Sequence, residues 1–141
     1  MREIKFRGKR LDNGEWVDGF VLFNQDKSEA VIAKLTDTEA VCENVALDTI
    51  GQFTGLHDKN GKEIYEGDVI TQYWGSPHYR NGEYYECNAR RGQVLFDKSG
   101  CFVLLSESLL YHLFGDGLTQ EVQGNIHDNP ELLITEQLWQ H

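Results

Sequence analysis

Short β-rich runs, each bounded by turn residues, constrain this fold more than any other sequence feature. The pair Asn13-Gly14 separates two such runs and predicts a type I′ hairpin, because both central positions of that turn need positive φ. Residues 36–48 have a weaker pattern and are expected to be irregular, despite a cap-like Thr36. The opening third therefore predicts a three-stranded meander, with strands at 3–7, 15–23 and 30–35.

The rest of the chain continues this pattern. Strands are predicted at 49–54, 69–74, 92–96, 101–105 and 121–126. Residues 97–100 predict a hairpin loop, whereas Ser106 is expected to cap a short helix that runs to His112 and ends at Gly115 and Gly117. The tail from 131 to 141 suits a short amphipathic helix. Many short strands with little helix predict a mainly β barrel or sandwich.

The stretch GLHDKNGKEIYEGD, residues 55–68, is rich in glycine and carboxylates and raises the question of a metal or phosphate loop. A calcium loop that begins at Asp58 needs oxygen ligands at its fifth and twelfth positions, where Lys62 and Val69 stand. A phosphate loop needs a Ser or Thr hydroxyl at the position that Glu63 occupies, and it needs a helix where a strand is predicted. Turn geometry explains the composition instead, and the predicted turn residues are Asn13, Gly14, Asp58, Asn60, Gly61, Glu66, Gly67 and Asp68.

The polar and aromatic segment 74–90 predicts a long hairpin or a mobile insertion. Its aromatic and arginine side chains are of the types enriched at interfaces. Tyr84 and Tyr85 are adjacent, so they face opposite sides of any strand that contains them. The candidate interaction surface comprises Trp74, Tyr79, Arg80, Tyr84, Tyr85, Arg90 and Arg91.

Charge and composition narrow the possible partners. The net charge of -10 opposes the phosphate backbone of nucleic acids, although residues 1–10 are basic and are interpreted as a solvated strand face. Three cysteines without CxxC spacing suit a reducing cytoplasm. No apolar run is long enough to span a bilayer, so a soluble, cytoplasmic protein is expected.

No catalytic, cofactor or metal residues are assigned from the sequence. The five histidines lack HxH or HExxH spacing, and no GxSxG elbow is present. His78 and Cys87 are the least implausible metal ligands, and they lie in the aromatic insertion. A non-enzymatic protein without a cofactor is therefore expected.

Three separated motifs carry a family resemblance. IGQFTGLHDKNGKEIYEGDVI at 50–70 resembles the most recognisable segment of the YopX-like family of bacteriophage and prophage proteins. MREIKFRG at 1–8 and VQGNIHDNPELL at 122–133 resemble that family's terminal segments, in the same order. The longer aromatic segment 73–90 departs from the family pattern.

The resemblance implies a fold and a phage origin, and it implies no catalytic site. It predicts one YopX-like domain over 1–141, mainly β, with an N-terminal β-meander at 1–48. An SH3-like small barrel would occupy 49–134 with the insertion 74–90, and 135–141 would form a short tail.

Three functions stay open on this basis. The first is a phage accessory protein that acts through contacts with itself or with a phage or host protein. The second is a barrel that binds nucleic acid through Arg80, Arg90, Arg91 and stacking aromatics. The third is an acidic mimic that occupies the nucleic-acid site of a host protein.

Overall fold

A computed structural model of the chain consists of two compact units, residues 1–56 and 57–141, which are described separately. The structure describes residues 3–75, 78–80, 83–85, 88–113, 115 and 117–133, with the backbone alone at 78–80 and 83–85. The division follows Leu56, later in the chain than the boundary after residue 48 that the sequence analysis uses.

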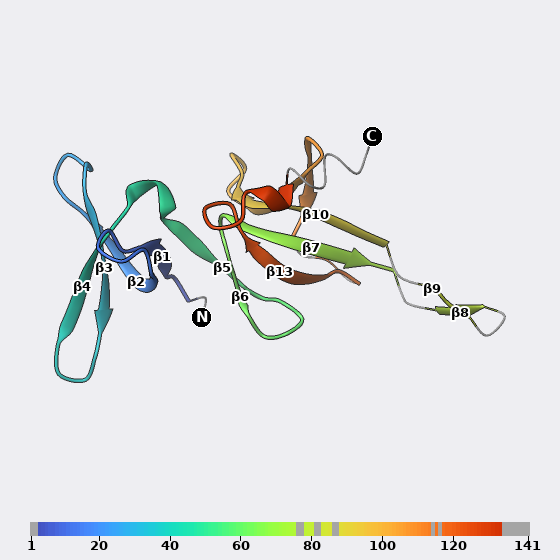
Figure 1. Ribbon diagram of the computed structural model, residues 1–141, viewed down its shortest axis with the longest axis horizontal. Coiled ribbons are helices and arrows are strands. Elements are labelled where there is room, and N and C mark those ends of the chain that lie inside the picture. The colour runs from blue at the N-terminus through green and yellow to red at the C-terminus, as the bar shows by residue number, and fades with distance from the viewer. Residues whose placement is uncertain are drawn as a thin grey trace. The chain divides into compact units, whose positions relative to one another are not determined.

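The first unit is built from antiparallel strands in the order β4-β3-β2-β1-β5 (Figure 1). The three strands predicted in the first third are observed with shifted ends, and a fourth follows them. The elements are β1 (Phe6–Lys9), β2 (Trp16–Phe23), β3 (Ala30–Leu35), β4 (Ala40–Val45), the 3-10 helix η1 (Leu47–Thr49) and β5 (Gly51–His57).

The sheet of the first unit rolls so that the end of β4 meets the chain just after β1. The Leu11 N–H donates to the Asn44 carbonyl at 3.0 Å, and the Ala46 N–H donates to the Lys9 carbonyl at 2.9 Å. The core lies inside this roll, where Ala30, Ile32 and Val45 are packed together. Partly buried apolar side chains complete it, namely Phe6, Val17, Val21 and Ile50.

Strand β4 replaces the irregular segment that the sequence analysis expects at 36–48. Its six residues pair with β3 from Ala30↔Val45 to Leu35↔Ala40. Thr36 caps a hairpin turn and not a helix, because its Oγ1 accepts the Glu39 N–H at 3.0 Å. Long-range pairing with an adjacent apolar strand outweighs the weak local pattern, as β-propensity depends on context.

The hairpin between β1 and β2 forms, but its turn is not type I′. Arg10 and Glu15 face each other through an N–H to carbonyl bond of 2.9 Å, so four residues make the loop. Gly14 has φ of 71°, whereas Asn13 is not among the residues of positive φ. The Asn13 side chain instead accepts the Glu15 N–H at 2.9 Å, a local bond typical of asparagine in turns.

The second unit holds a five-stranded antiparallel sheet in the order β12-β11-β10-β7-β13. Strand β7 lies between β10 and β13, and four of its seven residues are buried. It pairs with both neighbours in continuous register except for a bulge in β13 between Val122 and Gly124. The strands are β6 (Glu63–Tyr65), β7 (Asp68–Trp74), β8 (His78–Arg80), β9 (Glu83–Tyr85), β10 (Asn88–Phe96), β11 (Phe102–Ser106), β12 (Leu109–His112) and β13 (Thr119–Asn125).

One face of this sheet forms the core of the second unit. Ile70, Val94 and Leu104 share that face by register and have 0% exposure. Two glutamines on the same face bind the last residue of β12 and the residue after it. Gln72 Nε2 donates to the His112 carbonyl at 2.9 Å, and Gln120 Nε2 donates to the Leu113 carbonyl at 2.8 Å. Both backbone carbonyls at the end of β12 are therefore satisfied by buried glutamines.

The helix predicted from Ser106 to His112 is wrong. Ser106 ends β11, and Leu109 to His112 form β12, which pairs with β11 from Ser106↔Leu109 to Val103↔His112. Glu107 and Ser108, between the two strands, have φ of 52° and 68°. Two consecutive residues of positive φ make the tight two-residue turn of a hairpin, which Glu and Ser rarely adopt and which local propensity does not predict.

The described parts of the segment 74–90 pair with one another as in a long hairpin, one of the two arrangements predicted for it. Strands β7 and β10 pair to their ends, at Asn88↔Trp74, and β8 pairs with β9 in the chain between them. Residues 131–133 are helical, and the rest of the tail helix predicted for 131–141 lies outside the described residues, so that helix stays a prediction. The mainly β fold is thus confirmed, whereas closure of an SH3-like barrel stays a prediction.

Candidate interaction surfaces

Large apolar side chains are exposed on one face of the N-terminal sheet, which we call the outer face. Phe20 and Leu22 on β2 are 56% and 55% exposed, and Leu35 on β3 is 69% exposed. Residues paired across antiparallel strands point to the same face of the sheet. Ala33 of β3 pairs with Phe20 of β2 and with Cys42 of β4, which is also exposed, so Phe20, Leu22 and Leu35 share one face with Cys42. The outer face, defined by Phe20, Leu22, Leu35 and Cys42, is opposite to the packed interior.

The sequence analysis did not single out these residues, although β2 contains a signal. In WVDGFVLF the last four residues are all apolar, so successive side chains place apolar groups on both faces of the strand. Val21 packs in the core, and its neighbours Phe20 and Leu22 therefore point outward. An apolar run in a sheet with one packed face indicates an unpartnered second face.

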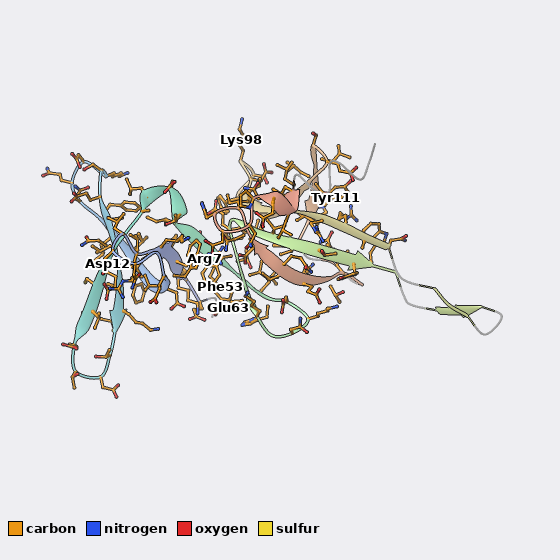
Figure 2. All side chains as sticks on the ribbon, in the orientation of Figure 1. Arg7, Asp12, Phe53, Glu63, Lys98 and Tyr111 are labelled. Carbon is orange, nitrogen blue, oxygen red and sulfur yellow. The ribbon has the colours of Figure 1, made fainter. Side chains whose placement is uncertain are left out.

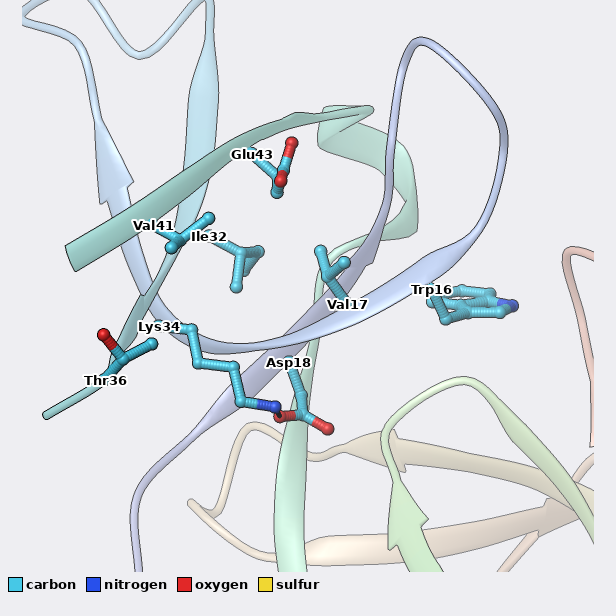
Figure 3. Close-up of a pocket in the computed structure, with 8 residues that line it drawn as sticks. All are labelled: Trp16, Val17, Asp18, Ile32, Lys34, Thr36, Val41 and Glu43. Atoms are coloured by element: carbon cyan, nitrogen blue, oxygen red, sulfur yellow. Dashed lines mark ion pairs between the residues drawn. The ribbon is translucent and has the colours of Figure 1, made fainter. Parts of the chain in front are cut away.

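A pocket of about 310 Å³ lies on the inner side of the same strands. Figure 3 shows Val17, Ile32 and Val41 around it, with Lys34 reaching Asp18. The Lys34 Nζ and Asp18 Oδ1 are 3.7 Å apart. Glu43, also in the lining, is paired with Arg10 at 3.2 Å. Four of the eight lining residues are polar or charged, and the three charged ones are already in ion pairs.

The structure describes the side chains of three of the seven residues predicted for the interaction surface. Trp74 ends β7, Arg90 and Arg91 are consecutive on β10, and all three are half-buried. Consecutive residues of a strand face opposite sides, so Arg90 and Arg91 belong to different surfaces. The other four predicted residues have side chains outside the described part, namely Tyr79, Arg80, Tyr84 and Tyr85. The prediction that the side chains of Tyr84 and Tyr85 face opposite sides of a strand therefore concerns side chains outside the described residues.

Trp74 and Arg90 do come together, and Tyr111 of β12 joins them. The Arg90 Cζ lies 4.0 Å from the centre of the Trp74 ring and 3.7 Å from the centre of the Tyr111 ring. Tyr111 is labelled in Figure 2. We call these three residues the arginine clamp. Sequence reasoning missed Tyr111, because it placed this residue in a helix.

Asp58 binds two distant parts of the second unit. Its Oδ1 accepts the N–H groups of Asn60 and Lys62, each at 2.9 Å. Its Oδ2 accepts the Val122 N–H of β13 at 2.9 Å. Burial by itself would raise the pKa of Asp58, but the N–H groups of Val122, Lys62 and Asn60 lower it overall. Both carboxylate oxygens are therefore used within the fold.

The two turns predicted within residues 55–68 lie at the two ends of β6. The first is closed by the Gly61 N–H, which donates to the Asp58 carbonyl at 3.0 Å, and Gly61 has φ of 84°. In the second, Gly67 has φ of 94°, and Asp68 Oδ2 accepts the Tyr65 N–H at 2.8 Å. Asn60 and Glu66 occupy the turns without positive φ.

The basic N-terminal residues are not simply solvated. Lys5, Arg7 and Lys9 alternate along one side of the first strand, and each lies over an aromatic ring. The Lys5 Nζ is 5.1 Å from the Phe53 ring centre, and Lys5 is only 19% exposed. Arg7 and Lys9 lie 4.6 and 5.7 Å from the Trp16 ring centre. These contacts place the positive charges against the protein, where they stabilise it modestly.

Among the described residues, no three His, Cys, Asp or Glu side chains are grouped as a metal ion requires. The side chains of His78 and Cys87 lie outside that part of the chain. No helix in the described segments has the length and apolar character to cross a membrane.

Comparison with known proteins identifies the family. A solved structure, the crystal structure of protein EF1440 from Enterococcus faecalis, is similar with a TM-score of 0.52 and 27% sequence identity, over 94% of this chain and 99% of that one. No curated protein matches the sequence. The family model described as YopX protein matches residues 5–134, nearly the whole chain. The chain therefore belongs to the YopX family.

Proposed function

We propose that the chain is a non-enzymatic accessory protein of a bacteriophage or prophage, which works in the bacterial cytoplasm through protein contacts and associates with itself. The observation that carries the proposal is the outer face, where Phe20, Leu22 and Leu35 are each more than half exposed on one side of a sheet. Membership of the YopX family supports the phage origin through the resemblance described above. The exposed thiols Cys42 and Cys101 suit a reducing compartment.

Burial of the outer face would be favourable. Removal of apolar surface from water contributes roughly 25 cal/mol per Å², and contiguous exposed apolar residues mark contact sites more often than isolated ones do. The outer face carries its large apolar residues on neighbouring strands β2 and β3, so a single partner surface can cover them together. A flat sheet face of this kind suits contact with another protein better than capture of a small molecule.

The ionisation of the carboxylates also favours a contact function. A general acid needs a carboxyl group with a raised pKa, held protonated by burial or by a second carboxylate. The resolved shifts go the other way, because the pKa values of Asp12, Asp26, Asp58, Asp97 and Glu121 are all lowered. For four of them the largest cause is a hydrogen bond from a neighbouring side chain, and Asp58 is the exception.

Light scattering coupled to size exclusion tests self-association. The wild-type chain is expected to form a dimer or larger oligomer at high concentration, and Phe20→Ser/Leu22→Ser is expected to be monomeric because it removes the apolar contact. Leu110→Ser is the matched control, since Leu110 is 51% exposed but lies on β12 of the second unit. A wild-type chain that stays monomeric at high concentration contradicts self-association.

A further inference from the structure

We propose that the arginine clamp of Trp74, Arg90 and Tyr111 is a recognition site for a carboxylate group, supplied by an acidic side chain or the C-terminus of a partner protein. The inference rests on the proposed function only for the source of that carboxylate. The site lies in the second unit, on strands other than those of the outer face.

The sheet brings the three residues together from separate strands. Arg90 pairs with Gln72 on β7, and Trp74 is two residues beyond Gln72, so both side chains share a face. Tyr111 pairs with Leu104, which in turn pairs with Val94 on β10, and this register places Tyr111 on the same face. Strand pairing therefore fixes the two rings beside the guanidinium group.

Among the described residues, the guanidinium of Arg90 has no acidic partner, and its charge faces aromatic rings. Its side chain lies over the rings of Trp74 and Tyr111, and within the described part its buried Nε has no hydrogen-bond partner. Arg10 shows the ordinary arrangement, in which Nε and Nη2 donate to both oxygens of Asp12 at 3.0 and 2.7 Å. An unpaired guanidinium is unexpected in a chain with 23 acidic and 13 basic residues.

The clamp determines the chemistry of the ligand. An aromatic ring attracts the face of a guanidinium, whose five N–H donors lie in its plane and need acceptors there. A carboxylate supplies two coplanar oxygens that match the arginine fork. A polyanion such as DNA is disfavoured by the net charge of -10, whereas a single carboxylate needs only the local contact.

Binding of a carboxylate at the arginine clamp can be measured directly in the wild-type chain. The ¹⁵N–¹H resonance of Arg90 Nε is followed by NMR during titration with a capped peptide that contains one glutamate, at constant ionic strength. Saturable shifts with a dissociation constant on the order of millimolar are expected for one such contact. The same peptide with glutamine in place of glutamate is expected to leave the resonance unchanged. Inorganic phosphate and oligothymidylate are titrated separately, to test whether the site prefers a phosphate group to a carboxylate.

Two variants sharpen the result. Arg90→Lys keeps the charge but removes Nε and the fork, so the signal that disappears in this variant assigns the Arg90 resonance. Its binding of the glutamate peptide is followed by the indole Nε1–H resonance of Trp74 and is expected to be roughly tenfold weaker than that of the wild type, followed in the same way. Arg91→Lys, on the opposite face, is expected to bind like the wild type. Absence of a shift, equal shifts with both peptides, or stronger binding of phosphate or oligothymidylate would each overturn the proposal.

The two proposals can fail separately. Phe20→Ser/Leu22→Ser is expected to keep the full Arg90 response while it loses self-association. A monomeric wild-type chain whose Arg90 responds to glutamate would refute self-association and leave the carboxylate site in place. An oligomeric chain whose Arg90 resonance does not respond to glutamate would refute the carboxylate site and leave self-association in place.

Discussion

Asp58 is a single residue on which two structural elements depend. Its carboxylate closes the turn at 58–62 and also binds the backbone of β13, 64 residues away in the sequence. The sequence analysis identified it as a turn residue, because aspartate at such a position commonly accepts local N–H bonds. The third bond, to Val122, depends on how the second unit folds and has no local sign in the sequence.

Replacement of Asp58 by asparagine should destabilise the protein. Asparagine has nearly the same size, but its NH₂ group would face a backbone donor in place of one carboxylate oxygen. A loss of about 1–3 kcal/mol is expected, as for other buried donors that lose their acceptor. Urea unfolding at neutral pH measures it. Asp97→Asn, in an exposed hairpin turn, is the control and should cost clearly less.

The lowered pKa of Asp58 predicts that its contribution to stability depends on pH. The pKa of Asp58 is lowered in the folded state from its ordinary value of 3.8. A lowered folded pKa means that the stabilisation is fully present above the unfolded pKa and is lost as pH falls through the folded value. The stability difference between wild type and Asp58→Asn should therefore shrink as pH drops below about 4. A difference that stays constant down to pH 2 would contradict this role.

At the scale of elements, the turn between β11 and β12 is the least predictable part of the fold. Ser106 before a polar pair resembles a helix cap, and nothing in the residues Glu107 and Ser108 favours positive φ. The hairpin forms because β12 covers an edge of β11 through four paired residues. Pairing between strands thus outweighs the local preference at this turn.

Ser108→Gly should stabilise this hairpin. Ser108 has φ of 68°, a conformation that costs an ordinary residue on the order of 1 kcal/mol and costs glycine little. A gain of about 0.5–1 kcal/mol in the free energy of unfolding is expected, measured by urea or thermal unfolding. Ser99→Gly is the control, since Ser99 lies in another hairpin turn without positive φ and should give no gain.

At the scale of the whole molecule, charge separates the proposed function from the nucleic-acid alternative. The chain carries -10 overall, and five of its described basic residues lie over aromatic rings of the protein, namely Lys5, Arg7, Lys9, Lys59 and Arg90. The acidic mimic is still an alternative, because a negatively charged surface can occupy the nucleic-acid site of a host protein. Pull-down from a host lysate, followed by competition with DNA, would distinguish a mimic from other partners.

Labelled single-stranded and double-stranded DNA should not bind at low salt. Low ionic strength strengthens every phosphate contact, so a protein that fails to bind there has no useful affinity at physiological salt. Fluorescence anisotropy is the measurement, and a basic DNA-binding protein is the positive control. Tight binding that weakens steeply with added salt would overturn the protein-contact function in favour of the barrel that binds nucleic acid.

The sequence by itself determined the mainly β fold, most of the strands and the positions of the tight turns. These features depend on alternation and on residues such as Gly61 and Gly67, whose conformational freedom acts within a few positions. Only the tertiary structure decided which face of β2 is covered, that 109–112 is a strand, and that Tyr111 meets Arg90. Those outcomes depend on pairing between strands distant in sequence, where register and burial outweigh local propensity.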